Sequence, residues 1–107
     1  MLRNGSYSAW YRTRLREGTG IVVLNDGKIT GGDASLAYTG TYFQNGDQFS
    51  ALITTWRHTP GPPSVFDIDN VDLTLTGTSA PTTASCTGIA KQAPGLAFEA
   101  TLVRMAD

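Results

Sequence analysis

The chain has 107 residues, 40% of them hydrophobic, and a formal net charge of −1 at pH 7. This length suits a single domain, and the near-neutral charge argues against general binding to nucleic acid. No apolar run approaches the roughly 18 residues that a membrane-spanning helix needs. The N-terminal residues lack the apolar segment of a signal peptide, and the one cysteine, Cys86, forms no internal disulfide, so we expect a cytoplasmic protein without membrane contact.

Turn signals recur at short intervals along the chain, and helix signals are nearly absent. The 12 glycines and five prolines separate segments rich in Thr, Ser, Val and Tyr. We expect about eight strands, near residues 5–16, 19–25, 27–31, 35–43, 48–58, 66–76, 83–91 and 96–105. Short connections make consecutive strands antiparallel neighbours, and closure removes exposed edges. The sequence thus predicts an all-β fold in which residues 1–107 form one small up-and-down antiparallel β-barrel.

The first expected strand carries a possible binding stripe. Arg12, Arg14 and Arg16 have one parity and would line one face of this strand, with Arg3 nearby. Such a stripe suits an acidic partner or a phosphate, although a solvated outer face is the favoured interpretation.

The second expected strand is apolar on both faces at Ile21, Val22, Val23 and Leu24. A barrel has only one dry face, so half of this run would be exposed in a monomer, and exposed apolar patches usually mark interfaces. We therefore predict a homodimer interface at these four residues. A loop or chain end covering the strand is the alternative.

Two glycines and an acid, Gly31, Gly32 and Asp33, fall where one short strand gives way to the next. Closing so few strands requires sharp bends, which glycines permit, and Asp33 could accept hydrogen bonds from local backbone N–H groups. We predict a structural barrel corner here, with a binding role as the alternative.

Candidate chemistry is sparse along the rest of the chain. His58 begins a stiff, proline-rich loop and has no recognised nucleophile motif near it, so we expect no catalysis. Asp67, Asp69 and Asp72 lack a calcium-loop pattern, and we expect surface acids rather than a metal site, or acids that meet the arginines of a second subunit. We expect no cofactor. Phe66 and Ile68 have the opposite parity to the residues after them, which predicts a bulge or break near residues 69–70.

Small residues share one parity on the seventh expected strand, at Ala84, Cys86, Gly88 and Ala90. If they face inward opposite large residues, they either leave a cavity for a small apolar ligand or are covered by Trp and Tyr rings. The filled interior is the preferred prediction, with Cys86 as a small buried apolar residue.

Several short motifs together resemble the GrlR-like family, whose namesake is a negative regulator of type III secretion gene expression. The matching residues lie between about residues 4 and 69 and are Gly5-x-Tyr7-Ser8, Gly18-x-Gly20-Ile21, Asp26-Gly27, Ile29-Thr30-Gly31-Gly32-Asp33, Tyr38-x-Gly40 and Pro63-Ser64-Val65. The resemblance implies a lipocalin-like barrel that forms a homodimer. It also implies negative regulation of transcription by contact with a transcriptional activator, without direct DNA binding.

The resemblance further assigns a partner-binding loop, at Gln44, Asn45, Gly46 and Asp47. In the family's namesake the corresponding loop is acidic and contacts the activator. In this chain the loop carries a single acid, Asp47. A barrel that binds or senses a small apolar ligand is the alternative function.

Overall fold

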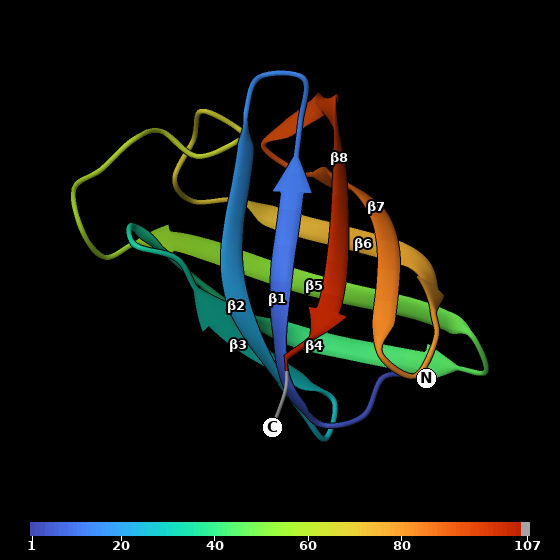
Figure 1. The fold of residues 1–107 in the computed structure, drawn as a ribbon. Helices are drawn as coiled ribbons and strands as arrows, with labels where there is room; N and C mark the ends of the chain where they lie inside the picture. The colour runs from blue at the N-terminus through green and yellow to red at the C-terminus, as the bar shows by residue number, and fades with distance from the viewer. Residues whose placement is uncertain (106–107) are drawn as a thin grey trace.

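The computed structural model describes residues 1–105, which form eight antiparallel strands closed into a barrel in the order β1 to β8 (Figure 1). The strands are β1 (Gly5–Arg12), β2 (Glu17–Asn25), β3 (Lys28–Gly32), β4 (Leu36–Asn45), β5 (Gln48–Arg57), β6 (Asp72–Ser79), β7 (Thr83–Ala90) and β8 (Ala93–Arg104). Each strand pairs with its neighbours in sequence, and β1 also pairs with β8, from Tyr7↔Arg104 to Arg12↔Glu99. The predicted fold class is therefore confirmed.

Alternating side chains explain why these segments become strands with one buried face. On β8, the side chains of Leu96, Phe98, Ala100 and Leu102 are buried, and the residues between them face outward. The β2–β3 turn places Asp26 at φ 50° and Gly27 at φ 86°. Two successive positive φ angles match the twist of a tight hairpin, which an Asp-Gly pair adopts readily.

Closure brings the two ends of the meander together at the front of the barrel. In Figure 1, β1, β2 and β8 run steeply across the front, and β4, β5 and β6 cross behind them. The β1–β2 hairpin lies at the top, and the long connection from β5 to β6 extends to the left.

Gly31 lies at a point where two backbones approach closely. A Cβ atom at Gly31 would lie 2.1 Å from the Ile21 carbonyl oxygen and 2.8 Å from the Val22 Cα atom, both on β2. A Cβ atom at Gly32 would lie 2.6 Å from the Leu36 carbonyl oxygen. Neither glycine has a positive φ, so they serve close packing of the backbone at this corner rather than a left-handed turn.

Two expected strands differ from those in the structure. β1 ends at Arg12, because Thr13 turns inward and its hydroxyl donates to the Val65 carbonyl oxygen at 2.6 Å. The strand expected over residues 66–76 instead runs from Asp72 to Ser79. Residues 58–71 instead form a long connection, so the expected change of parity near residues 69–70 is the end of a loop.

The inner core is continuous from the strands into this loop. Val65 and Phe66 are buried, and Phe66 stacks on Phe98 with ring centroids 5.2 Å apart. Within residues 1–105, no helix has the length and apolar character needed to cross a membrane.

Candidate functional site

The barrel contains a cavity of about 690 Å³ that is partly open to solvent. Its wall is mainly apolar and comes from most of the strands, including Val22, Ile29, Phe49, Ile53, Leu73, Leu75, Cys86, Phe98, Ala100 and Leu102. The prediction that Trp and Tyr rings fill the interior is wrong in part, because Trp10 and Trp56 lie on the outer surface with 37% and 40% of their area exposed. The small residues Ala84, Cys86 and Ala90 do face inward and are buried.

One end of the barrel is closed by the N-terminal segment. Leu2 is buried in the core, and its backbone N–H donates to Gln44 Oε1 at 2.7 Å while Gln44 Nε2 donates to the Leu2 carbonyl oxygen at 3.0 Å. The Ser79 hydroxyl also donates to Gln44 Oε1. Gln44 was predicted to bind a partner, but these contacts give its side chain a structural role. Asn45, Gly46 and Asp47 are exposed in the β4–β5 turn.

A cluster of three polar side chains lies in the cavity wall near the opposite end. The hydroxyls of Tyr11 and Tyr38 donate to Asp33 Oδ2 at 2.7 and 2.6 Å. The two hydroxyl oxygens also contact each other. Asp33 Oδ1 accepts hydrogen bonds from the backbone N–H groups of Ser35 at 2.9 Å and Leu36 at 2.7 Å. Asp33 therefore closes the β3–β4 turn with one oxygen and holds two tyrosines with the other.

Two glycines on β2 make room for these tyrosine rings. Gly18 pairs with Tyr11 across the β1–β2 ladder. A Cβ atom at Gly18 would lie 2.6 Å from the Tyr11 ring, and one at Gly20 would lie 3.0 Å from the Tyr38 hydroxyl. Glycine facing an aromatic ring lets the ring lie flat over the strand. The Gly18-x-Gly20 spacing, which lies between Tyr11 and Tyr38 in the chain, is the one sequence signal of this cluster, and the cluster was not predicted from it.

The two tyrosines of the cluster keep their hydroxyl protons, because the pKa of each is raised. Burial raises the pKa of both Tyr11 and Tyr38, and the negative charge of Asp33 raises both further. Burial alone would raise the pKa of Asp33, but the hydrogen bonds from Tyr38, Tyr11, Ser35 and Leu36 outweigh it and lower that pKa. Near neutral pH the cluster is one carboxylate with two protonated phenols.

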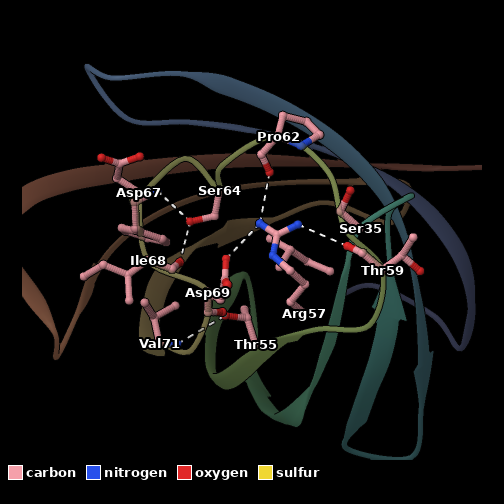
Figure 2. Close-up of polar contacts among 12 residues, drawn as sticks. Ser35, Thr55, Arg57, Thr59, Pro62, Ser64, Asp67, Ile68, Asp69 and Val71 are labelled. Atoms are coloured by element: carbon pink, nitrogen blue, oxygen red, sulfur yellow. Dashed lines mark hydrogen bonds and ion pairs between the residues drawn. The ribbon is translucent and has the colours of Figure 1, made fainter.

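The β5–β6 connection forms another part of the cavity wall, through Pro62, Pro63, Ser64, Val65 and Phe66. Figure 2 shows its backbone curving around the guanidinium group of Arg57, which lies at the end of β5. That group donates to the carbonyl oxygens of Thr59 at 3.2 Å and Pro62 at 3.0 Å, and to Asp69 Oδ1 at 2.8 Å. One arginine therefore joins both ends of the connection.

His58 links this connection to the β3–β4 turn. Its Nε2 atom lies 3.1 Å from the Asp33 carbonyl oxygen, and its Nδ1 atom lies 2.7 Å from the Thr59 hydroxyl. Cys86 is buried in the cavity wall, where burial raises the pKa of its thiol to about 11, so the thiol stays protonated. Within residues 1–105, no group of three or more His, Cys, Asp or Glu side chains is arranged to hold a metal ion.

The predicted arginine stripe does not form. Arg12 lies on β1 and pairs with Glu99 at 2.9 Å, Arg14 is in the following turn, and Arg16 reaches Asp67 at 3.1 Å. The acids expected at the surface, with the arginines of a second subunit as the alternative, also have contacts within the chain. Asp69 pairs with Arg57, and Asp72 accepts hydrogen bonds from Thr54 and Gln92.

The four residues predicted for a dimer interface divide into two faces. Ile21 and Val23 are 48% and 40% exposed, whereas Val22 and Leu24 point inward and are buried. The inclusion of Val22 and Leu24 is therefore wrong, because they belong to the barrel core. Ile21 and Val23 remain available on the outer surface.

In comparisons with known proteins, no family model and no curated protein matches this chain.

Proposed function

We propose that this protein is a non-catalytic binding protein whose barrel holds a small, mainly apolar ligand. The observation that carries this proposal is the cavity of about 690 Å³ with its largely apolar wall. Sites for small molecules typically measure about 300–1,000 Å³ and combine apolar walls with a few polar groups. Here the Tyr11–Asp33–Tyr38 cluster supplies polar groups of this kind.

The cavity has room for roughly 20 water molecules at liquid density. Water in contact with Leu, Ile, Val and Phe side chains makes few hydrogen bonds to the protein, so an apolar molecule that replaces this water gains free energy. The closed barrel offers this volume without a large rearrangement, because every strand is already paired on both edges.

Fluorescence titration with N-phenyl-1-naphthylamine, an apolar probe, tests the proposal. We expect the probe to bind the unmodified protein and to bind Ala100→Phe at least tenfold more weakly, because Ala100 lies in the cavity wall. Val103→Phe is the matched control, since Val103 lies on the same strand with its side chain 45% exposed on the outer surface. Equal binding by all three folded proteins would place the probe on the surface and contradict the proposal.

A second candidate function is protein-mediated regulation in the cytoplasm, as in the GrlR-like family. In this proposal the chain forms a homodimer and restrains a transcriptional activator by direct contact. The observation that favours it is an uncharged row on the outer surface, where Ser8 pairs with Ile21 on one side and Val103 on the other. Ile21 and Val103 are 48% and 45% exposed, and such apolar groups gain free energy when a partner covers them.

Sedimentation velocity over a range of protein concentrations tests the dimer. We expect a dimer that Ile21→Ser weakens, while Leu52→Ser, at a residue 61% exposed on β5, leaves association unchanged. Affinity capture from the native host would then test for an activator. A protein that stays monomeric at every concentration and captures no transcriptional activator would contradict this second function.

A further inference from the structure

The arrangement of protons in the Tyr11–Asp33–Tyr38 cluster specifies which head group the cavity accepts. This inference rests on the proposed binding of an apolar ligand and goes beyond it to the ligand's chemical class. The three side chains all belong to the cavity wall.

The cluster has no hydrogen-bond donor left for a ligand. Each tyrosine has one hydroxyl proton, and both hydroxyls lie within hydrogen-bonding distance of Asp33 Oδ2, at 2.7 and 2.6 Å. Both protons therefore remain inside the cluster. The oxygens of Tyr11 and Tyr38 keep lone pairs, because a hydroxyl oxygen can accept hydrogen bonds while its proton is donated elsewhere.

The carboxylate itself is fully engaged. Asp33 Oδ1 accepts from the backbone of Ser35 and Leu36, and Oδ2 accepts from the two tyrosines. A ligand therefore meets phenolic oxygens that can only accept hydrogen bonds, with a negative charge directly behind them.

The charge of the wall has one sign. Within residues 1–105, Asp33 is the only charged side chain of the wall that faces the cavity, because Glu17 lies on the outer face of β2, where it accepts a hydrogen bond from Trp10 Nε1 at 3.3 Å. An anionic head group would lose its hydration and meet the negative charge of Asp33 without a donor in the cluster, whereas a donor or a cation would be favoured.

We propose that the cavity takes an apolar ligand whose head group donates hydrogen bonds and carries no negative charge, a hydroxyl or a protonated amine, with the oxygens of Tyr11 and Tyr38 as acceptors. The site would then discriminate against fatty-acid anions of the same chain length.

Displacement of N-phenyl-1-naphthylamine by four ten-carbon compounds tests this assignment at pH 7.5. The compounds are 1-decanol, decylamine, decyl methyl ether and decanoate. We expect decanol to bind about threefold to tenfold more tightly than the ether, the ratio that one net hydrogen bond gives. Decanoate should bind at least tenfold more weakly than decanol. If decylamine binds much more tightly than decanol, the preferred head group is a cation. If decylamine and decanol bind equally, any head group that donates a hydrogen bond is accepted.

Substitutions test whether the preference for decanol over the ether depends on the hydroxyls of Tyr11 and Tyr38. In the double variant Tyr11→Phe/Tyr38→Phe we expect the ratio between decanol and the ether to fall to about two or less, while probe binding persists. Tyr42→Phe is the control, since its hydroxyl donates to Asn4 outside this cluster. If the double variant does not fold, each single variant should still lower the ratio.

The outcomes separate the two proposals. If the probe binds in the cavity but decanoate binds as tightly as decanol, or if the preference for decanol survives loss of both hydroxyls, the assignment of ligand class is wrong and the binding function stands. If neither the probe nor any of the four compounds binds, both proposals are overturned.

Discussion

Asp33 shows how one side chain joins local and long-range structure in this barrel. Its two oxygens accept hydrogen bonds from two backbone groups of the turn and from two tyrosines on β1 and β4. Hydrogen bonds to a charged group contribute about 1.5–3 kcal/mol each when buried, and less where water competes. Asp33 is therefore both a turn residue and the centre of the polar cluster.

Asp33→Asn should destabilise the protein by about 1–3 kcal/mol. Asparagine keeps one acceptor oxygen for the turn, but its NH₂ group cannot accept from the two phenols. Urea unfolding near neutral pH measures the loss. Asp47→Asn, in the exposed β4–β5 turn, is the matched control and should change the free energy of unfolding by less than about 0.5 kcal/mol. Equal stabilities for the two variants would contradict this role of Asp33.

The same variant should also change the dependence of stability on pH. The pKa of Asp33 is lower in the folded protein than its ordinary value, so the folded state holds fewer protons than the unfolded state in the acid range. The resulting stabilisation is fully present above the unfolded pKa of about 3.9 and is lost as the pH falls through the folded pKa. Urea unfolding repeated from pH 6 to pH 2.5 should therefore show the unmodified protein and Asp33→Asn converging. A gap in stability that stays constant to the lowest pH would show that ionisation of Asp33 does not matter.

The sequence predicted part of this residue-scale chemistry. A short acid after two glycines indicates a side chain that bonds nearby N–H groups, and Asp33 does so. The tyrosine contacts were not predictable in the same way, because they depend on the register of β1, β2 and β4. A shift of one residue would have turned Tyr11 or Tyr38 to the solvent.

Among the elements, the β2–β3–β4 corner depends most on residue size. At Gly31 a Cβ atom would meet backbone atoms of β2, which cannot move aside as a flexible side chain could. Gly31→Ala should therefore cost about 3 kcal/mol, at the upper end for overpacked sites. Gly95→Ala is the control, since a Cβ atom there has no neighbour within 4 Å. Thermal and urea unfolding of both variants measure the difference, and a Gly31→Ala protein as stable as Gly95→Ala would remove the structural reason for the glycine.

The connection between β5 and β6 depends on Arg57 rather than on strand pairing. Arg57→Met should change global stability by less than about 1 kcal/mol, because its ion pair with Asp69 is partly exposed to water. It should nevertheless increase hydrogen exchange within residues 58–71, at the N–H groups of Asp67 and Val71.

Arg12→Met is the control for this effect. Arg12 pairs with Glu99 on the outer surface of the barrel, away from the connection. Its replacement should leave exchange within residues 58–71 unchanged. Unchanged exchange in Arg57→Met as well would mean that the buried residues Val65 and Phe66 hold the connection without the arginine.

Strand order was predictable from short connections and turn residues, whereas this connection was not. Phe66 and Ile68 have the spacing of a strand. However, Phe66 lies in the loop between β5 and β6 and stacks on Phe98 in the core. Alternation along a short segment therefore shows that apolar residues are buried without showing that the backbone pairs. Arg57, which folds the segment back, contacts residues up to 12 positions away and leaves no local signal.

At the scale of the whole molecule, closure separates the residues into an outer surface and an inner wall. Closure could be inferred from eight short strands without a covering helix. The volume inside could not, because Trp56 lies between Thr55 and Arg57 as a core residue would, and only the register assigns it to the outside. A barrel with both indoles outside and a row of small residues on β7 retains an interior space.

That interior space should reverse the usual response to larger side chains. In a packed core, a small-to-large substitution costs about 1–3 kcal/mol. Ala100 lies in the cavity wall, so in Ala100→Leu the added atoms enter free space and should leave stability within about 0.5 kcal/mol of the unmodified protein or increase it. Ala90 is fully buried and is not part of that wall, so Ala90→Leu should show the full cost. Urea unfolding of both variants without added ligand measures the contrast, and an equal loss of stability in both would mean that the interior is packed.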